Sequence, residues 1–206
     1  FERRKKWIVK RNRRRRNPPN QIRLRENGSH LNEEFEIMNL EQLKYPVGKF
    51  VKPESITKEI IDSAISEIEN FPSFVKTEIQ NLDEKDLQLR YRPEGWTITQ
   101  VVHHCADSHI NSYMRFKLAL TENVPTIKPY EESLWAELPD NNLSPFVSLK
   151  LLDALHEKWV YILKSLSEED LNKEFIHPDQ SEKISLKENI LIYRWHCRHH
   201  LAHIRQ

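Results

Sequence analysis

Histidines gather in two short windows of the sequence. Seven of the ten lie there: His103, His104 and His109 in the first window, and His196, His199, His200 and His203 in the second. Neutral imidazole is the commonest metal ligand in proteins. Residues four apart on a helix share a face, so the second window offers two clamps, His196/His200 and His199/His203. The pattern predicts a divalent metal held between two helices.

Each window leaves a choice, because neighbouring helical residues point about 100° apart. In the first window the apolar stripe of the helix passes closer to His104 than to His103. In the second window Ile192 and Trp195 continue into a stripe with His199 and His203. We therefore predict the ligands His104, His199 and His203, and expect the remaining three to lie behind the ligands or face solvent: His103, His196 and His200. Three histidines leave a tetrahedral metal one open position, as in catalytic sites.

The remaining acidic, thiol and imidazole side chains are not predicted to bind the metal. No residue in these windows stands out as a general base, and the candidates are Asp107 and His109, of which His109 could line the cavity. Cys105 and Cys197 are predicted to be small core residues. The histidines without partners nearby in sequence are expected at the surface: His30, His156 and His177. A Ser-His-Asp triad is not supported, because no G-x-S-x-G is present.

The apolar pattern predicts four long helices. The first covers about residues 54–81, with a bend near Pro72. A T-x-x-Q capping box at Thr97 opens the second, which runs to about residue 121. Ser144 and Pro145 open the third, and an S-x-x-E box at Ser185 opens the fourth, which runs at least to His203.

A faint repeat organises these helices. Leu82–Leu87 resembles Leu166–Leu171, and each segment follows one long helix and precedes the next. The chain is therefore predicted to form two helical hairpins. The link of about 23 residues over 122–144 is long enough to run back along a helix, so the second and third helices should be parallel. This predicts an all-α four-helix bundle with one long crossover connection.

Composition excludes several other classes. The chain has 206 residues, of which 31% are charged and 38% hydrophobic, and no run approaches the ~18–20 apolar residues of a membrane helix. Three glycines argue against Gly-rich phosphate loops and Rossmann turns. Two cysteines do not make a disulfide framework, which favours a reducing compartment.

The net charge of +1 is the sum of a basic N-terminal segment and an acidic remainder. Residues 1–37 hold 12 Lys/Arg and 5 Asp/Glu, whereas residues 38–206 hold 20 Lys/Arg and 26 Asp/Glu. We predict that residues 1–37 are a disordered or non-native extension, that translation starts at Met38, and that residues 38–206 are the working domain. The basic charge is thus not taken as evidence for a nucleic-acid partner.

Two segments resemble a known family. Residues 90–109, RYRPEGWTITQVVHHCADSH, and residues 195–204, WHCRHHLAHI, resemble motifs of the DinB/YfiT-like proteins, and most closely the YfiT branch of Bacillus-type bacteria. The resemblance extends over about residues 44–206. It implies an up-down-down-up four-helix bundle with zinc or nickel bound by three histidines. In the family pattern the first ligand stands eight residues after a tryptophan, here His104 after Trp96, and the others are the pair His199 and His203.

The resemblance also implies a function. It indicates a cytoplasmic, homodimeric, metal-dependent hydrolase acting on a small molecule, with no nucleic-acid or membrane partner. One alternative is a thiol S-transferase that uses bacillithiol, in which Arg92 and Arg115 could hold carboxylates of the thiol, although we expect both to be surface charges. Another is a non-catalytic metal-binding bundle. The family's last helix usually continues beyond the third ligand, whereas this chain stops at Gln206, which implies a shortened last helix.

Overall fold

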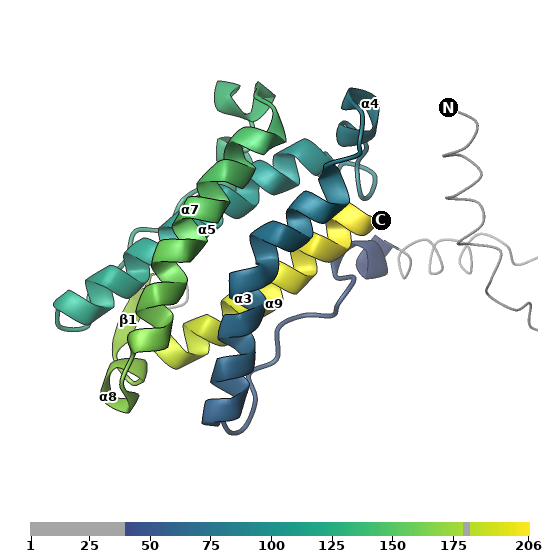
Figure 1. Cartoon of the computed structure of the whole chain (residues 1–206). Helices are drawn as coiled ribbons and strands as arrows, with labels where there is room; N and C mark the ends of the chain where they lie inside the picture. Colours follow the sequence, from purple (N-terminus) through teal and green to yellow (C-terminus); the bar gives the residue numbers. More distant parts are fainter. Residues whose placement is uncertain (1–39, 179–181) are drawn as a thin grey trace, which may run out of the picture. The chain divides into compact units, whose positions relative to one another are not determined.

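Four long helices form the body of the protein (Figure 1). The computed structural model describes residues 40–178 and 182–206. The long helices are α3 (Lys58–Ile79), α5 (Ile98–Thr121), α7 (Pro145–Ser165) and α9 (Leu186–Arg205). The first and last run in one direction and the middle two in the other, which is the predicted all-α, up-down-down-up arrangement. The predicted extension over residues 1–37, the proposed start at Met38 and His30 lie outside the described residues.

The helices pack in an order that the chain order does not suggest. Helix α3 packs against α9 and α7, and α5 packs against α7 and α9. Helices that follow one another in the chain, α3 with α5 and α7 with α9, therefore occupy opposite corners of the bundle. The parallel pairing of α5 with α7 confirms the prediction. The two predicted hairpins are antiparallel, but their helices are related across a diagonal and are not packed neighbours.

The predicted helix starts are largely confirmed. At the start of α5, Thr97 Oγ1 accepts the Gln100 N–H at 3.1 Å and Gln100 Oε1 accepts the Thr97 N–H at 3.1 Å, a complete capping box. At the start of α9, Ser185 Oγ accepts the Glu188 N–H at 3.3 Å. The Glu188 carboxylate pairs with Lys52 at 2.8 Å and does not close the box.

The two similar connectors adopt the same structure. Each forms a one-turn helix, α4 (Glu84–Leu87) and α8 (Glu168–Leu171), with a complete capping box. Their last residues, Leu87 and Leu171, are both buried against the bundle. The internal repeat in the sequence therefore corresponds to two capped one-turn helices, each of which connects one long helix to the next element.

The crossover contains structure that periodicity did not reveal. It carries α6 (Glu132–Trp135) and a 3-10 turn, η1 (Pro139–Asn142), and the Gln100 side chain donates to the Ala136 carbonyl at 3.1 Å. A small antiparallel hairpin, β1 (Glu174–His177) and β2 (Glu182–Ser185), precedes α9. The crossover reaches it through the Ile127 N–H, which donates to the Ile176 carbonyl at 3.0 Å. Four-residue strands give too little alternation to predict this hairpin from sequence.

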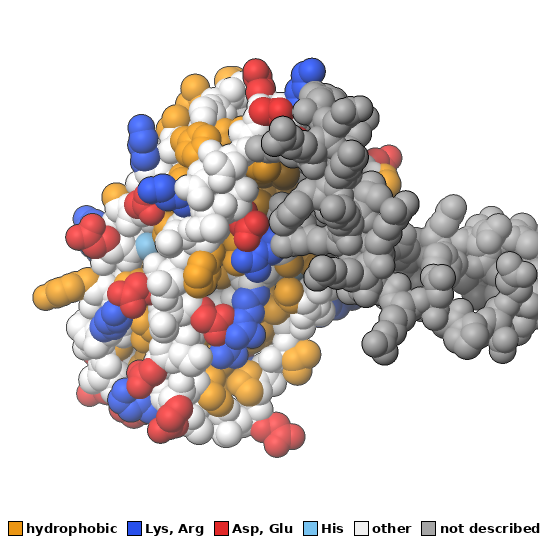
Figure 2. All heavy atoms as spheres, turned by 45° about the vertical axis from the view of Figure 1, so that its right-hand side comes forward, with side chains coloured by type: hydrophobic (Ala, Val, Ile, Leu, Met, Phe, Trp, Pro, Cys, Tyr) orange, Lys and Arg blue, Asp and Glu red, His pale blue; other side chains and the backbone are white. Residues whose placement is uncertain are grey.

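Aromatic residues fill the centre, and charges of both signs are mixed on one face of the surface. Trp159, Phe71, Phe116 and Phe175 are among the largest fully buried side chains. Figure 2 shows acidic and basic side chains interspersed on the face it presents. Ion pairs such as Arg198–Glu67, at 2.5 Å, join neighbouring helices. In the part of the chain that the structure describes, no helix is both long and apolar enough to span a bilayer.

The capping box of α5 predicts a measurable loss of stability. Thr97→Ala removes the side-chain acceptor for the Gln100 N–H, so the free energy of unfolding should fall by about 1 kcal/mol. Urea unfolding followed by circular dichroism measures this. Thr121→Ala is the matched control, because it removes the same atoms from an exposed position at the other end of α5 and should change stability by less than about 0.5 kcal/mol. Equal losses in both variants would contradict the capping assignment.

Candidate metal centre

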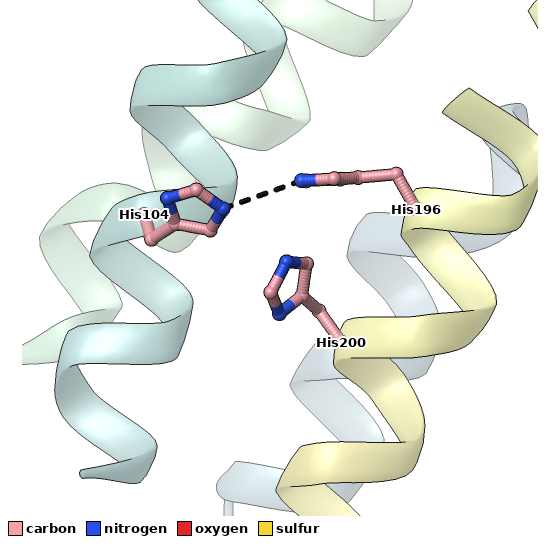
Figure 3. A group of neighbouring side chains, drawn as sticks. All are labelled: His104, His196 and His200. Atoms are coloured by element: carbon pink, nitrogen blue, oxygen red, sulfur yellow. Dashed lines mark hydrogen bonds between the residues drawn. The ribbon is translucent and has the colours of Figure 1, made fainter. Parts of the chain in front are cut away.

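Three imidazoles converge where α5 faces α9. His104 comes from α5, and His196 and His200 come from successive turns of α9 (Figure 3). His104 Nε2 and His196 Nε2 lie 3.3 Å apart, and the His200 ring centroid lies 4.7 Å from that of His104 and 4.4 Å from that of His196. One ring nitrogen from each of the three lies within 4.8 Å of the others. The site is therefore an i, i+4 clamp on one helix closed by a third histidine from another.

The structure does not bring the predicted trio together. His199 and His203 form a second group of three with His200, and among the described residues His104 belongs only to the first group. His203 Nε2 donates to the Lys44 carbonyl at 3.1 Å, and the His199 ring stacks on Trp195 at 4.6 Å. Both imidazoles thus contact the segment that precedes α3, His203 through this bond and His199 through Tyr45, whose ring lies 6.0 Å away.

This difference has a physical cause in the apolar stripe used for the prediction. Trp195 Nε1 donates to the Gly48 carbonyl at 2.9 Å, and the Trp195 ring meets Phe50 edge-on at 6.4 Å. The segment before α3 therefore covers one side of α9, while the bundle covers another. An apolar stripe on α9 can face either cover, so it does not identify the side that meets α5.

One pair of the first group has the nitrogen separation that a tetrahedral divalent metal requires. Zinc–imidazole bonds of about 2.0–2.1 Å with tetrahedral angles separate two ligand nitrogens by about 3.3–3.4 Å. The 3.3 Å between His104 Nε2 and His196 Nε2 matches that separation. Two nitrogens at this distance either share one proton or share a metal.

Burial keeps the clustered imidazoles neutral. Burial, with smaller contributions from His199 and His203, lowers the pKa of His104 to about 3. Burial also holds the pKa of His196 and that of His200 well below the usual range. The pKa values of His199 and His203 fall to about 4 for the same reason. At neutral pH each ring therefore retains a lone pair, which is the form that binds a metal.

The orientation of His200 follows from its neighbour. Because His203 Nε2 donates to a carbonyl, the neutral His203 ring offers its Nδ1 as an acceptor. His200 Nδ1 lies 3.4 Å from that nitrogen and is the donor of the pair. This leaves the lone pair of His200 on Nε2. Figure 3 shows one ring nitrogen of His200 directed toward the space between His104 and His196.

Two further histidines reach this site from behind. His109 is fully buried, and His156, predicted to lie at the surface, is only 2% exposed. The prediction for His156 was wrong although its spacing held the signal, since it lies four residues after Leu152 and three before Trp159, both buried.

The two remaining predicted histidines lie apart from the group. His103 is bonded to Ser148 Oγ at 2.7 Å and to the Leu143 carbonyl at 3.0 Å. His177 is half-buried at the end of β1.

A cavity of about 470 Å³ opens onto the histidines. Its wall holds charged groups, Lys44, Arg92 and Glu132, as well as aromatic ones; the other lining residues are Tyr45, Tyr91, Trp96, His104, Trp195, His196, His199, His200 and His203. Glu132, on α6 of the crossover, is the one carboxylate among the described residues that line it, and burial raises the pKa of this group while Arg115 opposes the rise. Sequence reasoning missed Glu132 because the crossover shows no period.

The other predicted chemical groups lie outside this wall. Asp107 is not among the described lining residues, and burial together with Asp140 raises its pKa to about 6. Arg115 does not line the cavity either, whereas Arg92 does. Cys105 and Cys197 are free thiols buried in the core, as predicted, and burial raises the pKa of each.

Known proteins resemble this chain over most of its length. Proteins of Bacillus cereus strain ATCC 14579 and Bacillus anthracis strain A0248, each with the name "Putative metal-dependent hydrolase", are 54% identical over 165 residues, which cover 80% of this chain and 95% of theirs. YfiT of Bacillus subtilis, described as "a probable metal-dependent hydrolase with an unusual four-helix bundle topology", has 44% identity and a TM-score of 0.77. That match covers 80% of this chain and 94% of YfiT.

A more distant structure shares the fold. The mycothiol-dependent maleylpyruvate isomerase has 16% identity and a TM-score of 0.58, with 70% of this chain and 60% of that chain covered. The family model described as the DinB superfamily matches residues 75–204, which include α5, α7 and nearly all of α9. The fold, the histidine cluster and these matches together show that the chain belongs to the DinB superfamily.

Proposed function

We propose that this protein is a metal-dependent hydrolase whose divalent ion, zinc or nickel, is held by His104, His196 and His200. Three neutral imidazoles grouped on the wall of one cavity support the proposal. The names of the Bacillus relatives support the reaction class. The proposal replaces His199 and His203 as ligands, because His104 groups with His196 and His200 and because His203 Nε2 is bonded to the Lys44 carbonyl.

The cavity supplies the other groups that hydrolysis needs. A divalent ion bound there supplies a Lewis acid that lowers the pKa of water toward about 7. Glu132 on the cavity wall would accept the proton of the attacking water, since burial raises the pKa of its carboxyl group and makes the carboxylate a stronger base. Lys44 and Arg92 on the same wall would attract an anionic group of the substrate.

The two wall cations also favour a second candidate function. A metal-dependent S-transferase that uses a low-molecular-weight thiol such as bacillithiol would bind carboxylates of the thiol at Lys44 and Arg92. It would need no general base once the thiolate had formed. The homodimer, the cytoplasmic location and the metal identity remain predictions, which light scattering, cell fractionation and elemental analysis would measure.

The proposed ligand set is tested by metal content. His104→Ala, His196→Ala and His200→Ala should each reduce bound zinc or nickel from one ion per chain to a small fraction, because two imidazoles bind much more weakly than three. Elemental analysis after dialysis measures this. His199→Ala is the matched control on the same helix and cavity wall, and it should keep the ion. Loss of the ion in His199→Ala with retention in His196→Ala would restore the ligand set predicted from sequence.

The reaction class is tested on the metal-loaded protein. We expect hydrolysis of members of an ester and amide panel, and Glu132→Gln should lower kcat by about 10²–10⁴-fold without loss of the metal. Glu131→Gln is the control, because Glu131 precedes Glu132 but does not line the cavity. Conjugation of bacillithiol to a chlorobimane without ester or amide hydrolysis would select the S-transferase instead. Absence of both activities would favour a non-catalytic bundle.

The buried histidines predict acid sensitivity of the metal-free protein. Their pKa values are lowered in the folded state. Below about pH 6.5 these histidines therefore bind protons in the unfolded chain while they stay neutral in the folded chain. Stability should therefore be complete above pH 6.5 and decrease as the pH falls toward about 4. Urea unfolding at pH 7.5, 6.5 and 5.5 should give a slope equivalent to roughly four or more protons at the acid end. An unfolding free energy that stays constant from pH 7.5 to 5.5 would contradict this.

A further inference from the structure

A line of hydrogen bonds runs from the proposed centre to the far side of the bundle. His196 Nδ1, on the side of the ring away from His104, lies 3.1 Å from His109 Nε2. His109 Nδ1 lies 2.7 Å from His156 Nε2, and His156 Nδ1 lies 2.7 Å from the Ile68 carbonyl oxygen. The line thus contains three imidazoles in series and ends on the backbone of α3.

The carbonyl determines the direction of every bond in this line. A carbonyl oxygen can only accept, so His156 Nδ1 must carry the proton. A neutral imidazole has one N–H, so His156 Nε2 accepts the Nδ1–H of His109. By the same step His109 Nε2 accepts the Nδ1–H of His196. The remaining lone pair of His196 is then on Nε2, the nitrogen that lies 3.3 Å from His104 Nε2.

Pro72 explains why this carbonyl is available. In an α-helix the carbonyl of residue 68 normally accepts the N–H of residue 72. Residue 72 is a proline inside α3 and has no N–H. The Ile68 carbonyl therefore lacks its helical donor, and a buried carbonyl needs a replacement. His156 supplies it from α7.

Packing excludes other partners from the line. His109 is fully buried and His156 is 2% exposed. The Phe71 ring lies 5.2 Å from the His109 ring and 5.9 Å from the His156 ring, and Trp159 meets both edge-on at 5.8 Å. Rings enclosed in this way cannot exchange their bonds for bonds to bulk water, so each nitrogen depends on its neighbour in the line.

We infer that His109 and His156 are positioning residues, which hold His196 in its Nδ1–H form and so present the His196 Nε2 lone pair to a bound metal. Hydrogen bonds of this kind to the outer nitrogen of a ligand histidine orient the ring. The inference rests on the proposed function for the identity of His196 as a ligand. The bond directions themselves rest on the Ile68 carbonyl and on the neutrality of the three rings, and they do not depend on a bound metal.

Nitrogen-15 NMR of the metal-free wild-type protein tests the bond directions. Two-bond correlations from the ring protons report which nitrogen of each histidine carries the proton. We expect His156, His109 and His196 each to show a single Nδ1–H form. An Nε2–H form at His109 or at His196 would overturn the inference, whether or not the protein binds metal.

Variants of His156 test the effect on the site. His156→Phe removes both polar atoms, so His109 and His196 should no longer hold a single form, and the dissociation constant for zinc should rise about 10–100-fold. His156→Gln should restore most of the affinity, because an amide can donate to the Ile68 carbonyl and accept from His109. Calorimetric titration with zinc measures the affinity, and NMR of each metal-free variant measures the proton positions.

His103→Phe is the matched control. His103 is also a buried histidine with two hydrogen bonds, and it lies on α5 next to His104, but its partners Ser148 and Leu143 are outside the line. It should lose comparable stability and leave the His196 form and the zinc affinity unchanged. Equal zinc affinities in His156→Phe and His103→Phe would overturn the inference. If His156→Phe does not fold, the wild-type spectrum and His156→Gln still decide it. Absence of metal binding or hydrolysis would refute the proposed function only.

Discussion

A buried neutral imidazole has one donor and one acceptor, and the site depends on this constraint. Burial disfavours the charged form of seven clustered histidines, so none of them can donate from both nitrogens at neutral pH. A group that only accepts must therefore determine where each proton lies. Two backbone carbonyls do so, Ile68 through His156 and His109, and Lys44 through His203. These two contacts therefore place the free lone pair on Nε2 in both His196 and His200.

The order of the helices makes the longer line possible. Its members come from every corner of the bundle: Ile68 from α3, His156 from α7, His109 from α5 and His196 from α9. Each step crosses between packed neighbours, since α3 packs on α7, α7 on α5 and α5 on α9. If consecutive helices were packed side by side, α3 would lie next to α5, and His156 could not connect them. The buried line of imidazoles therefore depends on the diagonal arrangement of the consecutive helices.

Local features were predictable from sequence, whereas the choice of packing partner was not. The Thr97 capping box and the repeated connectors depend on residues within a few positions of one another, and the structure contains both. Helix α9 is covered on more than one side, so the stripe through Trp195 indicated a contact with the segment before α3 as readily as one with α5. Glu132 was hidden for a different reason, because it reaches the cavity from a crossover that has no apolar period.

The neutrality of the line bears on the chemistry of the proposed centre. A carboxylate is a common partner for the outer nitrogen of a ligand histidine, and it adds negative charge beside the metal and raises ligand basicity. Here the partner of His196 is another imidazole, and the line ends on an amide carbonyl. Three neutral ligands with a neutral support leave the full double charge of a bound ion uncompensated by these groups. Such a centre attracts anions and polarises water more strongly than one backed by carboxylates. Glu132, the acidic residue on the wall of the same cavity, is the group that would offset part of this charge.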